Sequence, residues 1–373
     1  MQTNRLNGLI DRIRPNGKSR IMNSDYSTQR GPLRRERRGT TLWLTGCNGP
    51  VNALSQAVRS GLVEGVRQGD ADPAVQAIVV NCDGRTFFSG ADLAELGQGL
   101  QSPGLMEFVT ACDETTKPVI AALHGTVFGG GVVVAYACDH RIAAAGTRFA
   151  MPEVGLGLLP TFGGTQYLPR LLGIEATLQL VIDGAEWSES RALAAGLIDH
   201  VVPREDLLEA AEVAAKQGLP KRRVRDGHAH LRNACAGTMA FQRRRQAFLS
   251  NAPDLEAPVV CLDVMQSGLR KPLGEALVQE HKAFLRLLES TQSRRLRHLF
   301  FAERTLRRSS FDKAAVEGRL RVGGAGSEKL LATARALLRE GAVPDAETLD
   351  AFLVDIFGLE RHARSLIDEL LGE

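Results

Sequence analysis

Two glycine-bearing turns constrain the fold of this chain more than any other feature. One spans residues 84–93 and the other residues 124–133; each follows an apolar run, at 77–80 and 118–123, and leads into a helical pattern. Glycine lets another group approach the backbone closely, and the start of a helix presents unpaired N–H groups at the positive end of its dipole. Either turn alone is more typical of tight helix–strand packing. Together they indicate a site where backbone N–H groups from both turns converge as an oxyanion hole.

Strand-like and helix-like segments alternate between residues 40 and 205. This order is typical of an α/β fold with a largely parallel sheet. After about residue 203 the pattern changes, and only amphipathic helices are expected. We expect strands over 41–45, 77–80, 118–123, 141–145 and 148–151, early helices over 54–69, from 93 onward and from 129 to 138, and later helices over 204–216, 239–250, 273–289, 293–307, 328–340 and 346–357.

The chain accordingly divides into four predicted parts. Residues 1–39 form a basic leader, which we expect to be flexible because it holds the charged run from Arg34 to Arg38 and no sustained periodicity. Residues 40–205 form the α/β core, residues 206–310 a helical extension and residues 311–373 a helical tail. The first 40 residues carry a charge of +7, so the rest carries −4 of the net +3. The basicity therefore belongs to the leader and not to the core.

Composition and motif spacing exclude several classes of function. Aromatic residues make up only 5% of the chain, so a base-stacking nucleic-acid partner is not expected. No apolar run reaches the roughly 18 residues of a membrane span. Neither glycine turn has the spacing of a phosphate-binding loop or a dinucleotide fingerprint. His228 and His230 have no further clustered ligand, so no metal site is expected.

The six cysteines indicate the compartment. They form no Cys-x-x-Cys pair, and several sit in apolar segments, which is typical of free buried thiols in a reducing cytoplasm. We therefore expect a cytoplasmic protein. The N-terminus lacks the apolar region of a secretory signal, although its Arg-rich, acid-poor character resembles an organelle transit peptide. A disordered basic tail, or a start at Met22 instead of Met1, is the simpler interpretation.

Further segments join the two glycine turns in one recognisable pattern. They are residues 52–55, 84–93, 118–131, 139–143, 152–160, 163–173 and 194–202. In both order and spacing these segments resemble the enoyl-CoA hydratase/isomerase (crotonase) superfamily, and the resemblance covers roughly residues 40–205. It implies a crotonase-type spiral of ββα units that binds an acyl-CoA thioester, with coenzyme A as part of the substrate and no separate cofactor.

The closest resemblance is to the hydratase/isomerase half of the fatty-acid oxidation multifunctional enzymes. Residues 273–305 resemble the helical linker that those enzymes place before their dehydrogenase half. Only about 70 residues follow, too few for a Rossmann unit and its partner domain, so we expect the dehydrogenase domain to be absent. Residues 311–373 faintly resemble part of its helical domain, as a remnant would.

The resemblance assigns the two turns their chemistry. It implies that the amides of Ala91 and Gly130 are the oxyanion donors, which stabilise the enolate of the thioester. The turn at Ala53 would lie along the coenzyme A moiety. Gly90, Asp92 and Gly129 flank the two donors as candidate substrate-binding residues; a helix cap is the alternative role of Asp92.

A departure from the family pattern concerns the catalytic acids. The family's hydratases use two glutamates, and this chain retains the second as Glu153 but has Val133 at the position of the first. Valine can neither accept a hydrogen bond nor move a proton. The resemblance therefore favours an enoyl-CoA isomerase, in which Glu153 alone takes a proton from C2 and returns it to C4. Val133 would exclude water and raise the pKa of a nearby carboxyl group.

Other interpretations stay open. A weak hydratase, or a lyase, hydrolase or decarboxylase with the same oxyanion hole, is the alternative enzyme, and the side chains of Asp92, His124 and Tyr136 are candidate substitute acids. A non-catalytic acyl-CoA-binding subunit is the alternative outside enzymes. Phe162, where the multifunctional enzymes have a small residue, either reshapes the acyl pocket or packs in the core.

The expected partner is the acyl-CoA thioester. Beyond it, the chain could form a homo-oligomer, or its Arg-rich helices could dock other β-oxidation enzymes.

Overall fold

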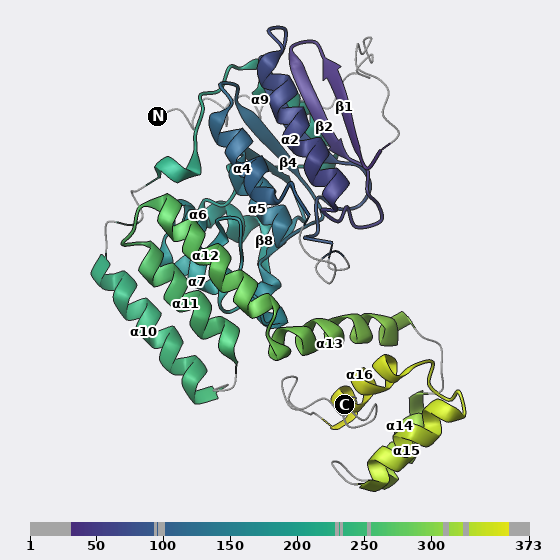
Figure 1. Ribbon diagram of the computed structural model, residues 1–373. Helices are drawn as coiled ribbons and strands as arrows, with labels where there is room; N and C mark the ends of the chain where they lie inside the picture. The colour runs from purple at the N-terminus through teal and green to yellow at the C-terminus, as the bar shows by residue number, and fades with distance from the viewer. Residues whose placement is uncertain are drawn as a thin grey trace.

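The molecule is built on a six-stranded sheet (Figure 1). A computed structural model describes residues 31–92, 95, 101–227, 231, 234–251, 255–308, 313–323 and 328–357. The strand order is β1-β2-β3-β4-β6-β9, and every neighbouring pair is parallel except β1–β2. The predicted α/β class with a largely parallel sheet is confirmed. The strands are β1 (Leu33–Arg38), β2 (Thr41–Gly46), β3 (Ala77–Cys82), β4 (Val119–Leu123), β6 (His140–Ala144) and β9 (His200–Val202).

A second, three-stranded sheet contributes to the second glycine turn and to the segment that holds Glu153. It consists of β5 (Thr126–Phe128), β7 (Arg148–Ala150) and β8 (Trp187–Ser188), with β7 in the middle. Because β5 lies within the second glycine turn and leads directly to Gly129, and β7 leads into Pro152–Leu156, this small sheet places the two segments side by side.

The expectation that the leader runs as a loop to residue 39 is wrong for its last residues. Leu33–Arg38 form β1, which pairs antiparallel with β2 at the edge of the large sheet. Its four arginines are partly buried, and the guanidinium carbon of Arg38 lies 4.7 Å from the ring centroid of Trp43. Because charged residues follow one another along this strand, it lacks the alternation of polar and apolar residues by which a strand is recognised in a sequence. Residues 1–30 lie outside the described residues.

Helices cover both faces of the large sheet. On one face lie α2 (Gln56–Ala71) and α4 (Leu105–Glu114), together with α5 (Gly130–Ala137), which fill the larger apolar core. On the other face α9 (Leu207–Lys216) packs its alanines against Trp43, Val79 and Ile120. The packed core therefore extends beyond the boundary expected at residue 205. The helix expected after residue 93 lies outside the described residues.

The rest of the chain is helical, as predicted: the described residues after 203 contain no strand. Sequence periodicity missed α11, which begins with Pro258 in its first turn, and α14. In the described part of the chain no helix is long and apolar enough to cross a membrane. The helices are α6 (Gly164–Leu172), α7 (Ile174–Val181) and α8 (Glu189–Ala195) within the α/β part, then α10 (Ala234–Asn251), α11 (Glu256–Gly268), α12 (Leu273–Leu288), α13 (Thr291–Arg308), α14 (Lys313–Gly323), α15 (Glu328–Arg339) and α16 (Ala346–Phe357).

The helical part has two regions (Figure 1). Helices α11 and α12 pack against α6, and Ser293 of α13 donates a hydrogen bond to the carbonyl of Leu156. Helices α14–α16 form a small apolar cluster of their own, with α16 lying against α13. The extension thus contacts the α/β part directly beside Pro152–Leu156.

Candidate active site

The two glycine turns meet in the folded chain. The N–H of Leu54 donates to the carbonyl of Gly90 at 2.9 Å, which makes an isolated parallel bridge between Leu54 and Ala91. A Cβ atom placed on Gly130 would lie 3.6 Å from the backbone nitrogen of Ala91. The two predicted oxyanion donors are therefore neighbours across a narrow gap.

The backbone leaves both donor groups available. The bridge to Leu54 uses the carbonyl of Gly90, and alternate residues of an extended segment direct their hydrogen-bonding groups to opposite sides. The N–H of Ala91 therefore points away from Leu54. Gly130 begins α5, and the first N–H groups of a helix have no partner within it. Among the described residues, neither N–H donates to a backbone carbonyl outside regular secondary structure.

Close packing explains the glycines around this gap. A Cβ on Gly131 would lie 1.9 Å from the carbonyl oxygen of Phe88, and one on Gly129 would lie 2.8 Å from Glu153 Oε1. Gly129 also has a φ of +51°, and Gly90 a φ of +116°, in the region that favours glycine. The turns can approach each other only because these positions lack side chains.

Glu153 lies at the edge of the same gap. It belongs to the 3-10 helix η1 (Pro152–Leu156), which follows β7, and its carboxylate lies against Gly129. The residue as a whole is partly exposed, but its Oε2 atom is buried and has no hydrogen-bond partner in the described structure. Burial raises the pKa of Glu153 from 4.5 to about 7. A carboxyl group of this kind exchanges a proton readily near neutral pH.

Val133 closes the first turn of the neighbouring helix. Its N–H donates to the carbonyl of Gly129, and its side chain is only 2% exposed within the main apolar core. The position at which the resemblance predicts a first glutamate is therefore a buried apolar group one turn from Gly129.

The predicted coenzyme A turn is tied to the first glycine turn. Asn52 has a φ of +49°, and its amide donates to the carbonyls of Asp83 and Thr86 at 2.9 and 2.8 Å. Asn48 donates to the carbonyl of Ala53. Sequence reasoning noted the turn around Ala53 but not that buried Asn52 anchors it. The sequence signal was the asparagine directly before Ala53, because asparagine is one of the few residue types that tolerate a positive φ.

Two of the three candidate substitute acids are unsuited to that role. The Tyr136 hydroxyl donates to the carbonyl of Phe162 at 2.7 Å, and burial raises its pKa well above its ordinary value. His124 is 2% exposed, and burial, assisted by the charge of Arg204, lowers its pKa to about 4, so it is neutral at pH 7. Asp92 is partly buried beside the donor Ala91, and its role as a cap or a site residue stays a prediction.

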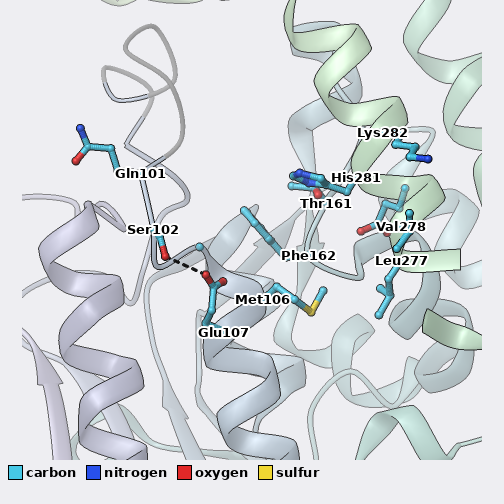
Figure 2. A pocket seen from close by; sticks show the side chains of 12 residues that line it. Gln101, Ser102, Met106, Glu107, Thr161, Phe162, Leu277, Val278, His281 and Lys282 are labelled. Atoms are coloured by element: carbon cyan, nitrogen blue, oxygen red, sulfur yellow. Dashed lines mark hydrogen bonds between the residues drawn. The ribbon is translucent and has the colours of Figure 1, made fainter. Parts of the chain in front are cut away.

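Phe162 lines a cavity of about 500 Å³ between the start of α4 and α12 (Figure 2). Its φ is +59°, and its ring packs at 3.1 Å from the position of a Cβ on Gly104. Met106 and Leu277 provide further apolar wall, while Ser102 and Glu107 form a polar end. Phe162 also packs against the main apolar core, so the structure shows both contacts, and its role in shaping an acyl pocket stays a prediction.

No metal centre is formed in the part of the chain that the structure describes: it contains no group of three or more His, Cys, Asp or Glu residues arranged to hold an ion. His228 and His230 lie outside the described residues.

Comparison with known proteins gives consistent findings. Residues 45–250 match the model of the enoyl-CoA hydratase/isomerase family. The chain is 35% identical over 274 residues to the peroxisomal bifunctional enzyme of Danio rerio, covering 70% of this chain and 36% of that protein. It is 32% identical over 275 residues to the glyoxysomal fatty acid beta-oxidation multifunctional protein MFP-a of Cucumis sativus, covering 70% and 38%. The chain thus spans little more than a third of the length of these curated relatives.

A solved structure supports the same relationship. A carnitinyl-CoA dehydratase from Mycobacterium avium 104 superposes with a TM-score of 0.53 at 25% identity, over 71% of this chain and 95% of that one.

Proposed function

Because the chain belongs to the enoyl-CoA hydratase/isomerase family, we propose that it is an acyl-CoA enzyme and, most simply, an isomerase that moves a double bond from C3–C4 to C2–C3. The expected crotonase-type fold with a helical region after it is confirmed. One observation carries the isomerase proposal: Glu153, whose Oε2 is buried without a partner, lies against Gly129 next to the donor Gly130, while Val133 stands where the resemblance predicts the first glutamate.

The reaction would begin with the thioester oxygen in the gap between the two glycine turns. The N–H groups of Ala91 and Gly130 donate to that oxygen and stabilise the negative charge that develops on it. Glu153 accepts the proton from C2, and the electron pair of the broken C–H bond delocalises over the thioester and the C3–C4 double bond. The same carboxyl group then returns the proton to C4, which leaves the double bond at C2–C3 and regenerates the carboxylate.

Burial of the carboxylate suits this proton transfer. A glutamate with a pKa of about 7 is basic enough to accept a proton and acidic enough to return it. The buried apolar side chain of Val133 offers no hydrogen bond to a water molecule. Hydration would require such a water to be held and deprotonated while it adds to C3.

Two other functions remain as alternatives. Hydration or dehydration is favoured by the name of one structural relative, a carnitinyl-CoA dehydratase. In a non-catalytic acyl-CoA-binding role, the two glycine turns would still bind the thioester, but Glu153 would transfer no proton.

The names of the curated relatives bear on the setting. We propose fatty-acid β-oxidation as the pathway class, since one relative is named for it. The relatives are named peroxisomal and glyoxysomal, whereas the cysteine pattern predicts the cytoplasm; fractionation of the source cells distinguishes these locations.

A pair of substrates separates the functions. The protein and its Glu153→Gln variant are incubated with 3-enoyl-CoA and with 2-enoyl-CoA thioesters. We expect isomerisation of the 3-enoyl substrate that collapses in the variant, while binding of a saturated acyl-CoA is retained. Rapid hydration of the 2-enoyl substrate by the unaltered protein would overturn the isomerase proposal. Binding without either reaction would favour the non-catalytic role.

A further inference from the structure

A buried glutamate of the helical extension is attached to the turn that carries Phe162. Glu280 on α12 is 1% exposed. Its carboxylate accepts hydrogen bonds from the N–H of Gly163 at 2.7 Å and the N–H of Thr165 at 2.9 Å, and a third from the Thr165 hydroxyl. Glu280 lies beyond the 45–250 segment that matches the family model.

These hydrogen bonds hold the turn at two consecutive residues with positive φ. Gly163 precedes α6 with a φ of +94°, and the residue before it, Phe162, also has a left-handed backbone conformation, which is uncommon for a bulky residue. A carboxylate that accepts from the first N–H groups of a helix stabilises that helix start. On its other side, Phe162 is held by the Tyr136 hydroxyl through its carbonyl. Phe162 therefore sits between two anchors, one from α5 and one from α12.

Phe162 forms part of the wall of a cavity near the proposed thioester site. Gly104 and Met106 line the cavity of about 500 Å³, and Leu105 between them lies 3.0 Å from the position of a Cβ on Gly130. The start of α4 therefore borders both the cavity and the second glycine turn, where the thioester of the proposed reaction would be held. An acyl chain extending from that turn toward α12 meets Phe162, which Figure 2 shows between the α4 side and the α12 side of the cavity.

We propose that Glu280 is a positioning residue: by holding the 161–165 turn, it keeps Phe162 in place as a wall of the acyl cavity and so limits the length of the acyl chain that the site accepts. This inference rests on the proposed acyl-CoA function, whichever reaction follows binding. It also gives the helical extension a role at the site, since α12 supplies both the carboxylate and part of the cavity wall.

The test measures binding and needs no turnover. Saturated acyl-CoA thioesters of short, medium and long chain are titrated calorimetrically into the unaltered protein and into Phe162→Ala, Glu280→Ala and the double variant. Removing the carboxylate leaves two buried N–H groups without their acceptor, which allows the turn to rearrange. We expect the ratio of long-chain to short-chain affinity to rise by about tenfold in both single variants, and not to rise further in the double variant.

Controls separate positioning from a loss of fold. Glu275→Ala alters an exposed glutamate five residues earlier on α12 and should leave the ratio unchanged. Glu280→Gln has nearly the same volume but keeps only one of the two acceptor oxygens, so it should raise the ratio by a smaller amount than Glu280→Ala; it carries the test if Glu280→Ala does not fold. Folding of every variant is followed by thermal denaturation.

The outcomes are distinct. A chain-length ratio that stays at the original value in folded Glu280→Ala or Glu280→Gln, while Phe162→Ala raises it, would overturn the positioning role and leave the proposed function standing. An unchanged chain-length ratio in Phe162→Ala would overturn the proposal that Phe162 limits the length of the acyl chain. Failure of the unaltered protein to bind any acyl-CoA would overturn the proposed function and this inference with it.

Discussion

The carboxylate of Glu153 lies so close to Gly129 that a Cβ on the glycine would stand 2.8 Å from Oε1. This contact links the second glycine turn to the proposed proton shuttle. Gly129 is needed for its φ of +51°, and also because any side chain there would displace the carboxylate from the gap. The two glycines that follow can be distinguished by what they contact.

Alanine substitutions at Gly131 and Gly130 should have different consequences. At Gly131 the new methyl group would collide with the backbone oxygen of Phe88. A backbone atom can give way only if the whole loop shifts, so we expect a loss of stability of roughly 1–3 kcal/mol or more. At Gly130 it would meet the side chains of Leu54 and Leu105, which can rotate. Gly130→Ala should therefore fold, but with a methyl group beside the Ala91 nitrogen its kcat should fall by about 10²-fold.

Denaturation and kinetics on the two variants check this pair. Equal stability of Gly131→Ala and Gly130→Ala would contradict the packing argument, and full activity of Gly130→Ala would contradict the oxyanion assignment.

The pH dependence of isomerisation should report Glu153. The base must be deprotonated to accept the C2 proton, and burial raises its pKa to about 7. We therefore expect kcat/KM, which follows the free enzyme, to be constant above that pH and to fall about tenfold per unit below it. A Glu153→Asp variant should keep this shape at a lower rate. A plateau that persists down to pH 5 would show that a carboxyl group with an ordinary pKa, or no carboxyl group, performs the transfer.

Introducing the missing glutamate should change the reaction. Val133→Glu restores a second acid one turn after Gly129, so we expect hydration of 2-enoyl-CoA to appear or increase. Since Val133 is buried, the variant should lose about 2 kcal/mol of stability or more, and its two carboxyl groups should titrate as a coupled pair.

Val133→Gln is the matched control for that variant, because it has nearly the same volume and polarity but cannot transfer a proton. Hydration that appears equally in the glutamine variant would refute the acid–base explanation.

Asp139 should be an important stabilising charge of the core. It is 2% exposed at the start of β6 and accepts hydrogen bonds from the N–H of Val119 and from Lys221 Nζ at 2.8 and 2.7 Å. Asp139→Ala leaves the partly buried ammonium group of Lys221 without its carboxylate partner, so we expect a loss of about 3–5 kcal/mol in urea denaturation.

The exposed pair of Arg148 and Glu186 provides the comparison for Asp139. Its side chains are 55% and 47% exposed, so Glu186→Ala should cost less than about 1 kcal/mol. Similar losses in both variants would mean that burial does not determine the contribution of the ion pair.

Local sequence patterns predicted the parallel core and the two glycine turns correctly. Apolar runs at 77–80 and 118–123 became β3 and β4 because uninterrupted β-branched and apolar residues suit a strand buried on both faces. Local patterns missed β1, since a strand at the sheet edge, paired on one side only, can hold four arginines and a glutamate among its six residues. They also missed α11, whose polar and apolar residues are not sharply segregated.

The sequence by itself determined which backbone conformations and which acid were available: glycines at the turns, Glu153 after Pro152, and valine at position 133. These follow from residue type, because only glycine tolerates the close approach and only an ionisable group moves a proton. The tertiary structure alone decided that Glu153 Oε2 is buried without a partner and that Glu280, 117 residues from Gly163, holds the Phe162 turn. Burial and contacts between distant residues depend on how elements pack, and no local spacing encodes them.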